Sequence, residues 1–158
     1  MTRLDDLGHA QYIFGVLLMM TNRIETLMER ELRPFDLTAK QWFLSALLET
    51  VFEEPPTLKE AAREMGSSYQ NVKQVALKLE GKELLELFPD KKDKRVTRLR
   101  LAEGKNEFWA AIQPKGQEFS AALFAGIPEA DLAAARRALE ALWHNLARME
   151  EPLTEGED

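Results

Sequence analysis

The stretch that decides the fold is residues 57–105, which read TLKEAAREMGSSYQNVKQVALKLEGKELLELFPDKKDKRVTRLRLAEGK. Thr57 opens a short helical segment that ends at Gly66, and Ser68 opens a second one that reaches Gly81. Both openings offer a hydroxyl that can accept a hydrogen bond from the free N–H groups of a helix N-terminus. A short helix, a turn, a second helix and then a change of period predict a helix-turn-helix followed by a β-hairpin.

The hairpin, or wing, is predicted from alternation with a period of two. Residues 84–88 form the first predicted strand and residues 96–101 the second, with a polar loop between them that starts at Pro89. Arg98 and Arg100 alternate with apolar residues on the second strand. This alternation favours a two-stranded hairpin with one buried and one solvated face.

The second helix of this motif carries the predicted base-reading surface. Val72, Val75, Ala76 and Leu79 form its inward stripe. Amide side chains can form paired hydrogen bonds with adenine, and lysine can contact guanine or phosphate. The helix N-terminus at Ser68 can bind a phosphate through its free N–H groups. The predicted DNA contacts on this helix are Ser68, Tyr69, Gln70, Asn71, Lys73, Gln74 and Lys78.

The hairpin loop supplies a second predicted contact with DNA. Six cations fall in ten residues, and an extended loop tipped with arginine can enter a minor groove. We expect Asp93 to fix the orientation of the Arg95 guanidinium through a charge-assisted hydrogen bond. The predicted DNA contacts in the loop are Lys91, Lys92, Asp93, Lys94 and Arg95.

The charge distribution is consistent with one local polyanion-binding surface. The whole chain has a net charge of −6, but residues 57–105 hold 12 Lys and Arg against 8 Asp and Glu. The remainder holds 9 against 19. A basic centre between acidic flanks favours one DNA-binding face, although charge alone does not decide the function.

Helical periodicity dominates the rest of the chain. An amphipathic helix is predicted over 9–33 and another from the Thr38–Gln41 capping box to about residue 52. A helix over 103–124 is interrupted by Pro114 and Gly116 and is expected to be kinked there, and a last helix has Pro128 in its first turn. The predicted fold is mainly α with a small two- or three-stranded β wing. Its parts are a single domain over 1–158, with a winged helix-turn-helix lobe at 38–105, helical dimerisation segments at 9–33 and 106–150, and an acidic tail at 151–158.

These motifs together resemble the MarR (multiple antibiotic resistance regulator) family of winged-helix transcription regulators. The resemblance covers residues 9–149 and is carried by residues 37–42, the helix-turn-helix 58–68, and the wing 89–104. Asp93 and Arg95 match the D-x-R signature of the wing. The resemblance implies a cytoplasmic homodimer that binds a pseudo-palindromic operator in double-stranded DNA, commonly as a repressor.

The chain departs from the family pattern at several positions. Glu83 stands where the family usually has glycine, and we expect Gly81 to take over the role of ending the helix. Asn71 and Gln74 replace the Thr or Arg frequent on the family's reading surface, so its base preference does not transfer.

The resemblance also implies a small aromatic effector bound between the dimerisation region and the wing lobe. Met is adaptable and suits an apolar pocket, although the same residues at helical spacing are also typical of a core. The apolar stripes of the first and last helices have no other obvious partner in a chain this short, which favours the homodimer. Candidate effector contacts are Phe14, Met20, Trp42, Phe43 and Trp109, with Met19, Met28 and Phe108 beside them.

Other classes of function have less support in the sequence. There is no cysteine, and no nucleophile elbow, phosphate-binding glycine loop or metal-ligand spacing around His9 or His144, so neither catalysis, a metal nor a cofactor is expected. The most apolar run, residues 12–20, is too short to cross a membrane. The main alternative is a winged-helix module that binds protein and not DNA; the salt dependence of binding distinguishes the two.

Overall fold

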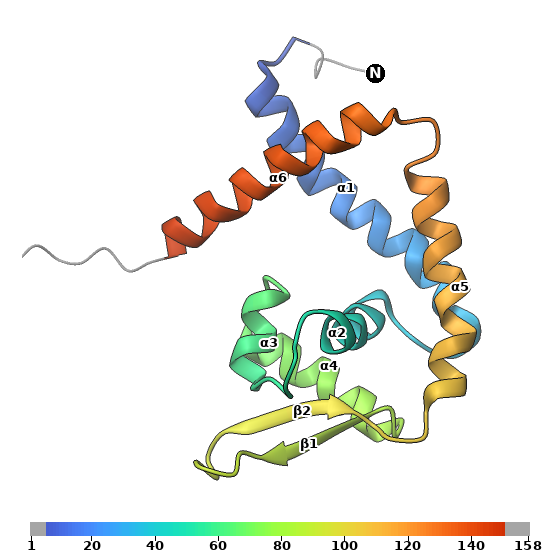
Figure 1. Ribbon diagram of the computed structural model, residues 1–158, viewed down its shortest axis with the longest axis vertical. Helices are drawn as coiled ribbons and strands as arrows, with labels where there is room; N and C mark the ends of the chain where they lie inside the picture. The colour runs from blue at the N-terminus through green and yellow to red at the C-terminus, as the bar shows by residue number, and fades with distance from the viewer. Residues whose placement is uncertain (1–5, 151–158) are drawn as a thin grey trace, which may run out of the picture. The chain divides into compact units, whose positions relative to one another are not determined.

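The computed structural model describes residues 6–150, which form helices and one hairpin (Figure 1). The predicted acidic tail, 151–158, lies outside the described residues. Two compact units are present, one up to residue 117 and one from residue 118 onward. The elements in chain order are α1 His9–Leu32, the 3-10 helix η1 Arg33–Phe35, α2 Ala39–Thr50, α3 Leu58–Glu64, α4 Tyr69–Gly81, β1 Leu85–Pro89, β2 Thr97–Leu101, α5 Asn106–Leu123 and α6 Glu129–Glu150.

The predicted starts of α2, α3 and α4 are confirmed by their capping hydrogen bonds. Thr38 and Gln41 form a reciprocal capping box, and Thr57 and Glu60 form a second one. The Ser68 hydroxyl accepts a hydrogen bond from the backbone N–H of Asn71 at 3.2 Å. Because each cap satisfies a donor that the helix itself leaves free, these residues fix where the helices begin.

Helix α4 ends at Gly81, as expected, but the residue that takes the left-handed conformation after the helix is Glu83. Gly81 is the last helical residue, whereas Glu83 has φ 57°. The N–H of Leu84 donates to the carbonyl of Leu79 at 3.0 Å, and that of Glu83 donates to Glu80 at 2.8 Å. This pair of bonds is a Schellman motif, and burial of both Leu79 and Leu84 supplies its hydrophobic contact. The packing of Leu84 therefore holds Glu83 in a conformation that glycine would adopt more easily.

The wing is a two-stranded antiparallel hairpin in which Leu85 pairs with Leu101 and Leu87 with Leu99. Leu85 and Leu99 are almost completely buried, so one face of the hairpin packs against the helices, as predicted. An isolated bridge between Thr57 and Arg98 extends pairing toward α3. The hairpin lies beside α2, α3 and α4 in the unit that ends at residue 117 (Figure 1).

The hydrophobic core lies in this first unit and draws on α1, α2, α3, α4, α5 and both strands. Fully burying a residue such as leucine contributes on the order of 2 kcal/mol to the stability of the fold. The shared core therefore holds α4 and the base of the wing in one compact unit. The largest fully buried side chains are Leu32, Leu44, Val72, Leu79, Leu85, Leu99 and Ile112.

Helix α5 is continuous from Asn106 to Leu123 and contains Pro114. It begins at Asn106, later than predicted, after a turn in which Gly104 has φ 74°. Gly116 lies close to Trp42: a Cβ at this position would lie 3.2 Å from Cζ2 of Trp42, a tight contact. The glycine therefore lets the Trp42 ring of α2 lie close against α5.

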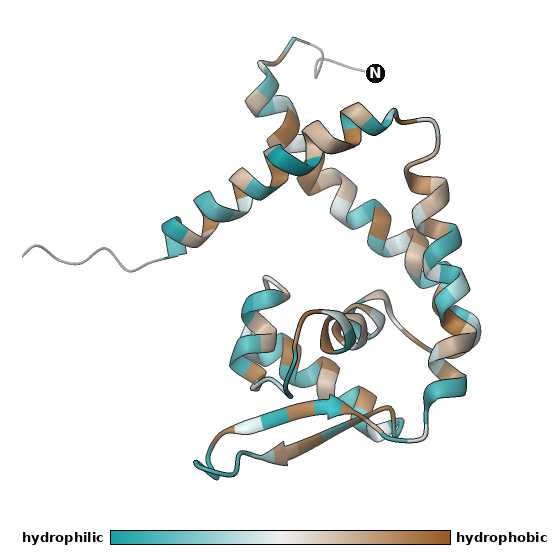
Figure 2. Ribbon diagram, viewed as in Figure 1, coloured by the Kyte–Doolittle hydropathy of each residue, from teal (hydrophilic) through white to brown (hydrophobic). Residues whose placement is uncertain are grey.

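Helix α6, in the second unit, contains no buried residue. Pro128 lies immediately before its first residue, and its carbonyl accepts hydrogen bonds from Asp131 and Leu132. Figure 2 shows hydrophobic and hydrophilic residues alternating along this helix. Among the described residues, no helix is long and apolar enough to cross a membrane.

Candidate nucleic-acid interface

Helix α4 presents a polar face to solvent and buries the opposite one. Val72, Ala76 and Leu79 have no exposed surface. These buried positions follow the helical period and anchor α4 on the core, while Val75, also predicted to face inward, is half-buried. Of the residues predicted to contact DNA, Ser68, Tyr69, Gln70, Asn71, Gln74 and Lys78 are exposed and Lys73 is half-buried.

The N-terminus of α4 has backbone N–H groups without an acceptor. Ser68 uses its hydroxyl for the N–H of Asn71 and its carbonyl for the N–H of Val72. The N–H groups of Tyr69 and Gln70 have no acceptor among residues 6–150. Free N–H groups at the positive end of a helix dipole attract a phosphate oxygen.

At the tip of the wing, Asp93 holds the Arg95 guanidinium with two parallel hydrogen bonds. Arg95 Nε donates to Oδ1 of Asp93 and Nη2 donates to Oδ2, both at 3.0 Å. These bonds lower the pKa of Asp93 and raise that of Arg95, so both groups remain ionised. The predicted hydrogen bond between them is therefore confirmed, while the Arg95 side chain stays 90% exposed and is free to meet a polyanion.

The start of the wing loop is organised by Asp90, which the sequence did not single out. Its Oδ1 accepts the N–H groups of Lys92 at 2.8 Å and Asp93 at 3.0 Å, and its Oδ2 accepts Nε of Arg98. The Arg98 guanidinium, together with these N–H groups, holds the pKa of Asp90 far below its usual value. The N–H of Asp90 also donates to the Val96 carbonyl at 2.8 Å, which closes the loop.

Two of the six wing cations form ion pairs on the strands, so fewer are free than the sequence suggested. Arg98 binds Asp90, and Arg100 binds Glu86 through Nη2 at 2.7 Å. Arg100 also lies over the ring of Phe88, 5.1 Å from its centroid. The exposed cations at the tip are Lys91, Lys92, Lys94 and Arg95.

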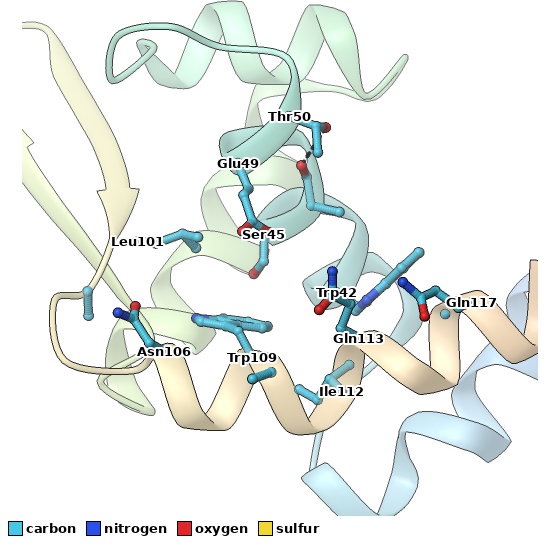
Figure 3. Close-up of a pocket in the computed structure, with 14 residues that line it drawn as sticks. Trp42, Ser45, Glu49, Thr50, Leu101, Asn106, Trp109, Ile112, Gln113 and Gln117 are labelled. Carbon is cyan, nitrogen blue, oxygen red and sulfur yellow. Dashed lines mark hydrogen bonds between the residues drawn. The ribbon is translucent and has the colours of Figure 1, made fainter.

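A cavity of about 480 Å³ opens between α2, β2 and α5 (Figure 3). Trp42 and Trp109, both predicted effector contacts, line it. The indole Nε1 of Trp109 is buried and has no hydrogen-bond partner among the described residues. The remaining lining residues are Ser45, Ala46, Glu49, Thr50, Leu101, Ala102, Asn106, Ala110, Ile112, Gln113, Gly116 and Gln117.

The other residues predicted to contact an effector are not among those that line this cavity. Phe14, Met20 and Phe43 are exposed. Met28 is a core residue, 4% exposed. Phe108 packs edge-on against Trp109, with ring centroids 5.1 Å apart. Periodicity could not separate these environments, because core, cavity and exposed positions share the same spacing.

Models of known protein families give no match to this chain, and no curated protein matches it in sequence. Solved structures match closely in fold. The S. aureus MepR–DNA complex superposes with a TM-score of 0.73 at 18% identity, over 88% of this chain and 98% of that one. AbsC, a MarR family transcriptional regulator from Streptomyces coelicolor, superposes with a TM-score of 0.75 at 18% identity, over 89% of this chain and 97% of AbsC. A MarR/EmrR family transcriptional regulator from Acinetobacter sp. ADP1 superposes with a TM-score of 0.78 at 17% identity, over 90% of this chain and 99% of that one.

The chain therefore has the winged-helix fold of the MarR family transcriptional regulators, as the sequence resemblance implied. None of the three matched proteins is described as an enzyme.

Proposed function

We propose that this protein is a sequence-specific regulator of transcription that binds double-stranded DNA, with α4 in the major groove and the wing tip in a flanking minor groove. The observation that carries the proposal is that one compact unit holds an α4 face of exposed amides and a wing tip with an oriented arginine. Exposed amides on α4 are needed to read base edges, and the oriented arginine is needed to enter the minor groove. Acting on chromosomal DNA would place it in the cytoplasm.

Electrostatics supports the same binding mode. The free N–H groups of Tyr69 and Gln70 would bind one phosphate, and the wing-tip lysines would bind others. Both lie in the basic central segment of an otherwise acidic chain, so DNA is attracted to this side alone. One structural neighbour was solved as a DNA complex, which agrees with this proposal.

We further propose that the working form is a homodimer. The apolar residues of α1 differ in burial along the helix. Met28 and Leu32 are buried in the core, but Phe14 and Leu18 are 67% and 58% exposed. On α6 the side chains of Trp143 and Met149 are 56% and 78% exposed. Exposed apolar surface of this kind is typical of an interface, and a second copy would also supply the second half-site of a pseudo-palindromic operator.

We propose repression, relieved by a small aromatic effector in the cavity between α2 and α5. The support is the cavity itself, with two tryptophans in its wall and an indole N–H that lacks an acceptor. The cavity also includes Leu101 and Ala102 at the base of the wing, so a bound molecule would contact the DNA-reading lobe.

The decisive experiment selects bound fragments from genomic DNA and measures binding to the recovered site as salt is raised. A DNA-binding regulator should select a pseudo-palindromic site, and its affinity should fall steeply with salt because neutralised phosphates release counterions. No enrichment, with weak binding that salt does not change, would favour the alternative of a protein-interaction module. Sedimentation of the free protein tests the dimer: a stable 18.1 kDa monomer at micromolar concentration would exclude it.

A further inference from the structure

We infer that the cavity between α2, β2 and α5 selects a positively charged aromatic molecule and rejects aromatic carboxylates. This inference rests on the proposed role of the cavity as an effector site. It concerns the chemistry of the ligand, which the fold does not specify. All lining residues belong to the unit that ends at residue 117.

The first argument is the charge of the lining. Glu49 is the charged residue among the lining residues, which include no lysine, arginine or histidine. Its carboxylate makes no hydrogen bond or ion pair with another described residue, whereas Glu25, Glu83 and Glu86 each have a cationic partner. Glu49 is exposed, so its charge acts through partly solvated space; an anion bound beside it would meet no counter-charge, while a cation would meet the unpaired carboxylate.

The second argument is the pair of tryptophans. Trp42 comes from α2 and Trp109 from α5, and Figure 3 shows Ser45 and Glu49 on the α2 side of the cavity, across from Trp109. The face of an indole ring attracts cations more strongly than the other aromatic side chains do. Gly116 brings Trp42 close to α5, so both rings belong to one space. An aromatic cation can therefore stack on indole while its charge is balanced by Glu49.

Helix dipoles do not reverse this preference. The cavity meets the N-terminus of α5 at Asn106, which favours anions, but it also meets the C-terminus of α2 at Thr50, which favours cations. The two partial charges are similar in size and opposite in sign. Neutral donors, among them Asn106, Gln113 and the unpartnered indole N–H of Trp109, can hydrogen-bond a carboxylate but cannot neutralise it. The charge of Glu49 therefore determines that the cavity prefers a cation to an anion.

The test uses three probes of similar shape and different charge on the full-length protein: N-methylquinolinium, 1-methylnaphthalene and 1-naphthoate. Binding is followed by the ¹H–¹⁵N NMR signals of the three tryptophan indoles, assigned with single Trp→Phe variants. The signals of Trp42 and Trp109 should move, and that of Trp143 on α6 serves as an internal reference. We expect the cation to bind about tenfold more tightly than the neutral probe, and the anion to bind more weakly than either.

Variants locate the charge preference. Glu49→Gln should weaken cation binding by about three- to fivefold and leave the neutral probe unchanged, since the carboxylate is partly screened by solvent. Glu49→Lys should favour the naphthoate. The matched control is Glu53→Gln, which removes the same charge from a residue that does not line the cavity and should change neither.

The outcomes separate the two claims. Naphthoate binding as tight as methylquinolinium binding, or equal losses in Glu49→Gln and Glu53→Gln, would overturn the charge preference and leave the cavity as an effector site. No movement of the Trp42 and Trp109 signals with any probe would overturn the charge preference and the cavity's proposed role together. DNA binding, measured on the same preparation, is independent of both results.

Discussion

A hydrogen bond from the Arg98 Nε to the Asp90 carboxylate joins strand β2 to the wing loop, at the loop end of the hairpin. The same guanidinium donates from Nη1 to the carbonyl of Pro55 at 2.6 Å, in the loop before α3. The N–H of Leu99 donates to the carbonyl of Pro56 at 3.0 Å, one residue along each segment. The wing is therefore attached to the helix-turn-helix by side-chain and backbone bonds together.

Replacing Arg98 tests whether this attachment orients the wing for DNA. Arg98→Gln should weaken DNA binding by about three- to tenfold, because a mobile wing loses more entropy on binding. Fluorescence polarisation on the selected operator measures the effect. Arg100→Gln is the matched control, since it removes the same charge from the same strand but breaks only contacts within the hairpin, with Glu86 and Phe88, and should cost at most about twofold. Equal losses in the two variants would mean that charge alone matters.

The depressed pKa of Asp90 predicts a particular dependence of stability on pH. Because the folded state binds the ionised form more strongly, the stabilisation is complete above the unfolded pKa of about 4 and is lost as pH falls through the lower folded pKa. Wild type should therefore be more stable than Asp90→Asn at neutral pH, and the difference should shrink below about pH 4. Thermal unfolding between about pH 2.5 and 7 measures both proteins; a difference that does not change with pH would contradict this assignment.

Glu83→Gly should stabilise the protein by about 1 kcal/mol, because it relieves a left-handed conformation that glycine adopts freely. Gly81→Ala is the contrasting variant. Gly81 is helical with open space around its Cβ position, so alanine there should stabilise the protein by about 0.5–1 kcal/mol. Urea unfolding measures both. Destabilisation by Gly81→Ala would show instead that Gly81 is the residue that must be left-handed.

The same position shows how far the sequence predicts local structure. Gly66 ends α3 with φ 58°, as its residue type suggested, because the left-handed conformation favours glycine. At the end of α4 that reasoning chose Gly81, but the buried contact between Leu79 and Leu84 decides the register and places Glu83 there. Residue preference is local, whereas this contact depends on the packed core.

In the candidate site, too, the features set by local spacing could be predicted from the sequence, and those set by distant residues could not. The exposed face of α4 followed from the spacing of Val72, Ala76 and Leu79, and the hydrogen bond between Asp93 and Arg95 followed from their separation of two residues. The attachment through Arg98 did not, because its partners Asp90 and Pro55 lie 8 and 43 residues away. An aspartate at the start of a hairpin loop, followed by an arginine on the returning strand, is the signal that could have indicated it.

Gln70→Ala and Asn71→Ala should each change base preference, with a loss of roughly 1–3 kcal/mol at a contacted base pair. Both side chains are exposed in the first turn of α4, so neither substitution should disturb the core. Competition between the selected operator and single-base variants measures the change. Equal losses on operator and random DNA would assign these residues to the DNA backbone and not to its bases.

The most direct test of DNA binding through the wing is Arg95→Ala, measured by fluorescence polarisation on the selected operator. We predict a loss of more than about tenfold in affinity with an unchanged dimer and nearly the same melting temperature, because the side chain is exposed and supports no other part of the fold. Arg23→Ala, which removes an exposed arginine from α1, should bind like wild type. Wild-type affinity in Arg95→Ala would contradict the account.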